Sequence, residues 1–142
     1  MAVRVKVLIK RGEAEVETVA IANSGYESDE PELVVPTKVA ERLGMWPEFS
    51  PGTKVEAYES PAGTSLFYVV PKAANIAVEA KDKSTEPVVT TIAISDKESE
   101  VLLSDKLIDS LNIELKKPGM GIWRFGDDPS GKERMSEKPE YW

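Results

Sequence analysis

One stretch of the sequence, residues 17–45, constrains the fold more than any other. It reads ETVAIANSGYESDEPELVVPTKVAERLGM. Its first apolar run is strand-like and ends at Asn23-Ser24-Gly25, a tripeptide suited to a tight turn because Gly supplies positive φ and Asn tolerates it. A second apolar run stops at Pro36 and leads into a helical pattern. The stretch therefore predicts strand, turn, strand and helix in succession.

The helix at the end of this stretch has recognisable boundaries. Thr37 is a candidate N-cap, because its hydroxyl can accept a hydrogen bond from a free N–H of the first turn. Gly44 directly follows Leu43, where a left-handed C′ residue is favoured. We expect a helix over residues 37–43 that is entered directly from the second strand.

The composition removes several classes of functional site. The 142 residues include no cysteine and no histidine, so disulfides, thiol chemistry, imidazole ligands and Ser-His catalysis are all excluded. The net charge of −7 argues against binding to nucleic acid or to an anionic membrane. No spacing typical of a metal or phosphate site occurs, and we expect no metal and no cofactor.

The hydropathy of the chain bears on its location. No apolar run approaches the ~20 residues that a membrane-spanning helix requires. The N-terminal residues alternate apolar with basic side chains, as a strand does and a signal peptide does not. We therefore expect a cytoplasmic protein. Its many Glu and Lys residues are compatible with a thermophilic source.

The rest of the chain is mainly strand-like. Residues 2–22 alternate as an antiparallel hairpin, and residues 54–70 form a second hairpin. The turn of this second hairpin comprises Ser60, Pro61, Ala62, Gly63 and Thr64. Further strands are expected over 76–80, 88–94, 101–103 and 120–125, with a helix that Ser104 caps and that runs to residue 111.

The last residues differ in composition from those before them. Residues 126–142 read GDDPSGKERMSEKPEYW and contain few apolar side chains. We expect this tail to be loosely ordered unless Tyr141 and Trp142 dock onto the domain. The predicted organisation is one domain over 1–125 followed by a polar tail over 126–142.

Part of the chain resembles another part. Residues 32–44 read ELVVPTKVAERLG and residues 100–112 read EVLLSDKLIDSLN, at a constant offset of 68 (100 − 32). Each copy follows a similar strand, and aligning those strands sets Asp96 against Asn23. The repeated order of strand, loop, strand and helix predicts an internal pseudo-twofold repeat.

These features together resemble the single-lobed, retropepsin-like aspartic proteases. The resemblance implies a mainly β fold, namely a closed β-barrel of the retropepsin-like (acid protease) type with two short α-helices. It also implies a homodimer, because each subunit of such a protein supplies half of the active site. The 54–70 hairpin then takes the place of the flap over the cleft. The motifs that carry the resemblance are Asn23-Ser24-Gly25, Val34-Val35-Pro36, Val39-Ala40 and Leu43-Gly44.

One departure from the family pattern concerns catalysis. The position of the catalytic Asp holds Asn23, and an aspartic protease needs two carboxylates that share a proton. An amide cannot ionise in that role, although Ser24 could still hydrogen-bond across the dyad and Gly25 could still make the turn. Recovery of a carboxylate would require Glu27 or Asp29 to move in, or Asn23 to deamidate. We expect no peptidase activity of this type.

The expected function is therefore a catalytically silent, aspartic-protease-like domain that acts as a peptide-binding or assembly module. It is expected to be homodimeric and to hold an extended peptide beneath the flap hairpin by strand addition. One alternative is an active or atypical aspartic endopeptidase. A second alternative is a swapped-hairpin DNA-binding regulator, which residues 34–55 (VVPTKVAERLGMWPEFSPGTKV) also resemble. The acidic charge and the many additional strands count against this second alternative.

Overall fold

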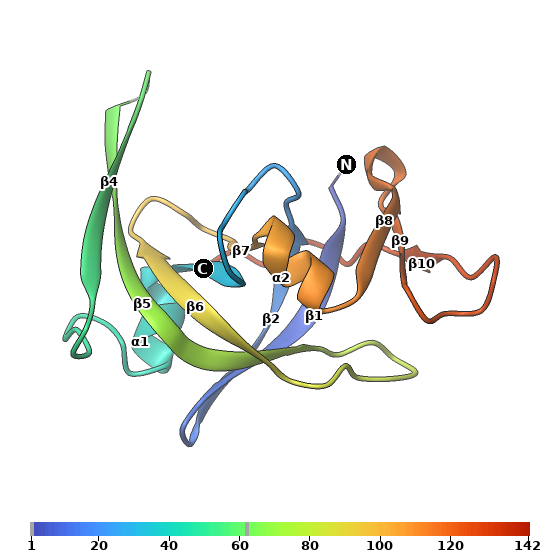
Figure 1. Ribbon diagram of the computed structural model, residues 1–142, viewed down its shortest axis with the longest axis horizontal. Helices are drawn as coiled ribbons and strands as arrows, with labels where there is room; N and C mark the ends of the chain where they lie inside the picture. The colour runs from blue at the N-terminus through green and yellow to red at the C-terminus, as the bar shows by residue number, and fades with distance from the viewer. Residues whose placement is uncertain (1, 62) are drawn as a thin grey trace.

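The alternating and apolar runs of the sequence fold into one closed β-barrel with two short helices at its ends (Figure 1). The computed structural model describes residues 2–61 and 63–142. The elements are β1 (Arg4–Arg11), β2 (Ala14–Ala22), β3 (Glu32–Pro36), α1 (Thr37–Arg42), β4 (Lys54–Ser60), β5 (Gly63–Val78), β6 (Val88–Ser95), β7 (Val101–Leu103), α2 (Asp105–Ser110), β8 (Ile113–Lys117), a 3-10 turn (Pro118–Met120), β9 (Ile122–Phe125) and β10 (Arg134–Met135).

The barrel closes because β5 is long enough to serve two parts of the sheet. The strand order is β1-β2-β7-β3-β6-β5-β4, and β1 also pairs with β5, so six strands form the ring. β5 has sixteen residues and pairs with β6 on both sides of an irregularity between Val70 and Ala74. Pro71 lies in this irregularity, where a strand tolerates the missing N–H. The second strand of the expected 54–70 hairpin and the separate strand expected over 76–80 are therefore one bent strand.

In the middle of the sheet, two parallel strand pairs flank one antiparallel pair. β2 runs parallel to β7, and β3 runs parallel to β6. Between these two pairs, β3 and β7 are antiparallel, with Leu33 opposite Leu103 and Val34 opposite Leu102. The two strands of each parallel pair are distant in the sequence, because several other elements lie between them.

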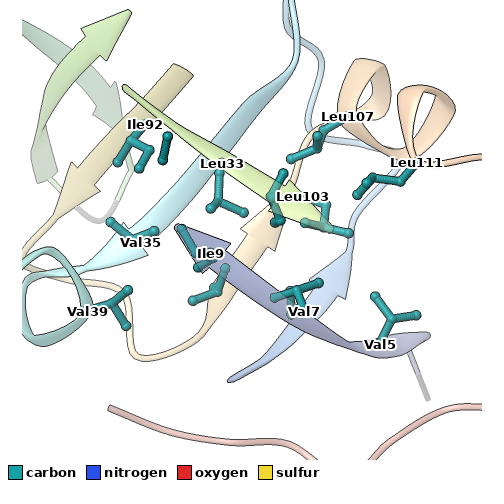
Figure 2. Packing of buried hydrophobic residues seen from close by; sticks show 14 of the residues in the cluster. Val5, Val7, Ile9, Leu33, Val35, Val39, Ile92, Leu103, Leu107 and Leu111 are labelled. Carbon is teal, nitrogen blue, oxygen red and sulfur yellow. The ribbon is translucent and has the colours of Figure 1, made fainter. Parts of the chain in front are cut away.

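The alternation along the strands separates two apolar clusters. In β3, Leu33 and Val35 face the main core, whereas Val34 faces the opposite side of the sheet. Removing each large core side chain from water contributes about 1.5–3 kcal/mol. Figure 2 shows core side chains from several elements meeting in the interior: Val5, Val7, Ile9, Leu33, Val35, Val39, Ile92, Leu103, Leu107 and Leu111.

The helix boundaries follow the sequence signals with one correction. Ser104 is the N-cap of α2, and its Oγ accepts a hydrogen bond from the N–H of Leu107, as expected. Gly44 has φ +72°, which confirms its left-handed role after α1. Thr37, however, is the first residue of α1 rather than its N-cap. Pro36 takes the N-cap position without a side-chain hydrogen bond, because the helix begins where the pairing of β3 ends.

The segment after β9 packs back along the barrel. The N–H of Arg4 donates to Ser136 Oγ, and the N–H of Glu137 donates to the carbonyl of Arg4, each at 2.8 Å. Trp142 donates from Nε1 to Thr18 Oγ1 at 2.9 Å. The sequence predicts a loosely ordered tail over 126–142 unless Tyr141 and Trp142 dock. Trp142 docks, whereas Tyr141 remains 66% exposed.

An ion pair fixes the turn between β9 and β10. The side chain of Asp128 is 3% exposed, and it accepts hydrogen bonds from Arg134 and from the N–H of Phe125. Arg134 also pairs with Asp82 in the turn between β5 and β6. The bonds from Arg134 hold the pKa of Asp128 well below its usual range. Arg134 therefore ties the C-terminal segment to the barrel.

We predict that Asp128→Asn lowers the free energy of unfolding at neutral pH by about 2 kcal/mol. The loss is smaller than for an isolated buried pair, because Asp82 still pairs with Arg134. The effect is complete above the unfolded-state pKa of about 3.9 and disappears as the pH falls through the depressed pKa of the folded state. Urea denaturation across this pH range measures it. Asp127→Asn is the matched control, and an equal loss in this exposed neighbour would contradict the account.

Candidate functional site

The Asn23-Ser24-Gly25 turn is built on the parallel pairing of β2 with β7. Beyond the last β2 residue, the N–H of Asn23 donates to the carbonyl of Leu103 at 3.2 Å. Asn23 Oδ1 accepts from the N–H of Gly25 at 3.1 Å, and the Asn23 carbonyl accepts from the N–H of Tyr26 at 3.0 Å. All three turn residues are exposed. The side-chain oxygen of Asn23 therefore holds the turn closed, as in an Asx-turn.

Gly25 is needed here for a different reason from the one expected. Its φ is not among the positive values of the described residues. A Cβ atom at Gly25 would instead lie 3.3 Å from Asn23 Oδ1, closer than an ordinary contact. The expectation of positive φ is therefore wrong. The glycine provides space for the Asn23 side chain to bond across the turn.

Ser104 connects the loop after this turn to α2 and β3. It is fully buried, and its Oγ accepts from the N–H of Glu32 at 3.1 Å as well as from the N–H of Leu107. One residue further, Asp105 donates its N–H to the carbonyl of Tyr26 at 2.8 Å. Both ends of the Tyr26–Glu32 loop are thus fixed to the start of α2.

A cleft of about 340 Å³ lies between this loop and the β4–β5 hairpin. In Figure 1 the hairpin projects beyond the barrel, at the left of the view. Val34, Val69 and Ala93 form a buried apolar floor, with Phe67 and Leu102 packed against it. The remaining lining residues are polar: Tyr26, Glu27, Glu32, Glu56, Tyr58, Ser65 and Glu98. We call this space the hairpin cleft.

Two tyrosine–glutamate pairs occupy opposite walls of the hairpin cleft. On the loop side, Tyr26 OH donates to Glu32 Oε2. On the hairpin side, Tyr58 OH donates to Glu56 Oε2 at 2.9 Å. Burial raises the pKa of Tyr26 and that of Glu32, and the charge of Glu56 raises both further. The bond to Glu56 raises the pKa of Tyr58. The two pairs therefore act as one negative cluster.

A second hollow, of about 510 Å³, continues from the hairpin cleft along β5 and β6. It shares Glu32, Glu56 and Tyr58 with the cleft and adds further carboxylates from Asp29 and Glu30. Among the described lining residues of both hollows, the only basic side chain is that of Lys54 in the second hollow. The combined groove is strongly acidic.

The expected catalytic tripeptide lies beside the hairpin cleft rather than in it. Asn23, Ser24 and Gly25 form one exposed turn, but they are not lining residues of the cleft. Their neighbour Tyr26 does line it. The turn therefore directly precedes a cleft residue in the sequence, while its own polar groups face solvent.

The binding residues expected at the hairpin tip are Ser60, Pro61, Ala62, Gly63 and Thr64. Pro61, Gly63 and Thr64 are exposed at the tip and do not line the cleft. Ser60 pairs through its backbone with Gly63, and Ala62 lies outside the described residues. The body of the hairpin supplies the lining instead, through Glu56, Tyr58, Ser65, Phe67 and Val69.

Sequence reasoning missed the four residues of the tyrosine–glutamate pairs. The alternation of β4 does place Glu56 and Tyr58 on one face of the strand. Nothing in that alternation shows which face looks toward the barrel. The Tyr26–Glu32 pair closes across an irregular loop, for which no sequence period exists.

The described residues contain no group of three or more Asp or Glu side chains placed to hold a metal ion. Within the same residues, no helix is long and apolar enough to cross a membrane. No family model matches this sequence, and no curated protein matches it either.

We predict that Glu32→Gln stabilises the protein near pH 7. Glutamine keeps an oxygen that can accept from Tyr26 OH, but it has no charge to be buried. Because the folded-state pKa of Glu32 is raised, the contribution of Glu32 to wild-type stability falls as the pH rises from the unfolded-state value of about 4.3 through the folded-state value. Urea denaturation should find the variant more stable at about pH 7 and equal to wild type at about pH 3. Lower stability of the variant at neutral pH would contradict this electrostatic explanation.

Proposed function

We propose that this chain is a catalytically silent domain of the retropepsin-like type, which binds peptide segments in the hairpin cleft and assembles as a homodimer. The observation that carries the proposal is the position of the cleft. One wall is the body of a projecting hairpin, and the other begins directly after the Asn23 turn. This is the arrangement that the sequence resemblance implies for a flap above a substrate cleft.

The strand pairing supports an internal twofold relation. The offset of 68 residues in the sequence repeat relates Val34 to Leu102 (102 − 34), and these two residues face each other in the β3–β7 pair. A twofold rotation that places β3 on β7 would also place β2 on β6. It would therefore superpose the β2–β7 pair on the β6–β3 pair, and both of these pairs are parallel. A twofold axis between Val34 and Leu102 accounts for all three pairings.

The same registers change one detail of the repeat. Ala22 lies opposite Leu103, while Val35 lies opposite Ile94. If Val35 and Leu103 are equivalent, then Ala22 corresponds to Ile94, and Asn23 corresponds to Ser95. The sequence alignment had set Asp96 against Asn23, one residue further on. The register supports Ser95, rather than Asp96, as the counterpart of Asn23.

The lack of peptidase activity follows from the chemistry of Asn23. A shared-proton mechanism requires two carboxylates, and an amide does not titrate in this range. Asn23 Oδ1 is also engaged with the N–H of Gly25. The turn keeps its shape and its exposure, so that Asn23 and Ser24 can meet the same turn of a second copy. In the proposed dimer, this contact serves assembly rather than catalysis.

Peptide binding is supported by the edge of the sheet. β4 ends the strand order, and in the described part of the chain it pairs with β5 alone. An extended segment can add to such an edge through backbone hydrogen bonds while its side chains enter a neighbouring pocket. The hairpin cleft lies beside this edge, since Glu56 and Tyr58 of β4 line it.

We predict that wild type sediments as a dimer and does not cleave a mixed peptide library, whereas Asn23→Asp gains cleavage at acidic pH. Aspartate keeps the oxygen that accepts from Gly25 and restores a carboxylate from each subunit. Mass-spectrometric detection of products measures cleavage, with Asn23→Ala as the control.

Hydrolysis by wild type that Asn23→Ala abolishes would establish the atypical peptidase instead. A wild-type protein that is monomeric at all concentrations would contradict the proposed assembly. Salt-dependent binding to DNA would favour the swapped-hairpin alternative.

A further inference from the structure

We infer that the hairpin cleft selects a basic side chain, lysine or arginine, in the extended segment that it binds. This inference rests on the proposed peptide-binding function and adds the chemical class of the ligand.

The floor of the cleft suits the aliphatic stem of a long side chain. Val34, Val69 and Ala93 form the second apolar cluster, separate from the barrel core, and Phe67 and Leu102 pack against it. Lysine and arginine bury their methylene stems on such a surface while their charged ends reach polar groups beyond it. The cleft volume of about 340 Å³ admits one such side chain with room to spare.

The walls of the cleft supply the charge that a basic end group needs. Glu32 and Glu56 come from opposite walls, and each accepts a hydrogen bond from a tyrosine hydroxyl, which orients its carboxylate. Glu27 and Glu98 complete the lining carboxylates. A guanidinium or ammonium group between Glu32 and Glu56 would donate to both, which fixes its position as well as its charge.

No basic side chain of the described residues neutralises this cleft from within. Lys54 lines the second hollow but not the hairpin cleft. Lys97 lies near the hairpin, but its Nζ donates to the carbonyl of Thr64 at 2.7 Å. The repulsion between Glu32 and Glu56 therefore persists in the free protein. A ligand cation relieves it, whereas a neutral side chain does not and an acidic one increases it.

The test uses the full chain and pools of seven-residue peptides, the length of β4, with random flanking residues and one fixed central residue. The central residue is lysine, arginine, norleucine or glutamate. Fluorescence anisotropy should show the lysine and arginine pools binding about tenfold more tightly than the norleucine pool. Glutamate pools should bind least. The preference for basic residues should weaken as salt is added.

Two variants locate the preference. Glu32→Gln and Glu56→Gln should each reduce the preference for lysine over norleucine several-fold. Glu56 is exposed, so that its replacement tests the charge without disturbing the fold. Glu59→Gln is the matched control, because Glu59 is also an exposed β4 residue but does not line the cleft.

Equal binding of the lysine and norleucine pools would overturn this inference and leave the peptide-binding function intact. A basic preference that survives both Glu32→Gln and Glu56→Gln would also overturn it, since the cation would then bind elsewhere. Binding of none of the pools would contradict the proposed function itself, and the inference with it.

Discussion

The fold depends on β3, a strand of five residues that is paired on both sides, with β6 and with β7. It runs parallel to β6 and antiparallel to β7, so its backbone groups are satisfied from two distant parts of the chain. Its side chains serve both faces, because Leu33 and Val35 enter the barrel core while Val34 forms the floor of the hairpin cleft. A shift of one residue in its register would exchange these roles. The same strand therefore contributes side chains to both the barrel core and the floor of the cleft.

Polar contacts around β3 position the two walls of the hairpin cleft, namely the loop before β3 and the β4–β5 hairpin. Ser104 caps α2 and also accepts from the N–H of Glu32 at the start of β3. This contact holds Glu32 where it meets Tyr26, while the register of the hairpin holds Glu56 opposite. The negative charge at the cleft is a cost to the free protein, since the pKa of Glu32 is raised. A site that carries such a cost is well suited to a positively charged ligand.

Much of the architecture could be predicted from local sequence signals. The alternation of β1, the apolar run of β3, the cap at Ser104 and the left-handed Gly44 are each determined within a few residues. What could not be predicted depends on partners distant in the sequence. Pro71 does not end its strand, because the rest of β5 pairs with β6 and closes the barrel on β1. The acidic cleft likewise forms only when the Tyr26–Glu32 loop and the β4–β5 hairpin lie together in the fold. No periodicity in the sequence predicts that contact.

The central claim is that two copies of the chain meet at the Asn23 turn. Because the sequence has no cysteine, a single Ser24→Cys substitution gives a clean test by oxidative cross-linking. A disulfide forms only when the two Cα atoms come within about 7 Å. The account predicts a covalent dimer of Ser24→Cys under mild oxidation and none for Glu13→Cys, at the exposed turn between β1 and β2 on the other end of the barrel (Figure 1). A monomeric Ser24→Cys protein, or equal cross-linking of both variants, would contradict it.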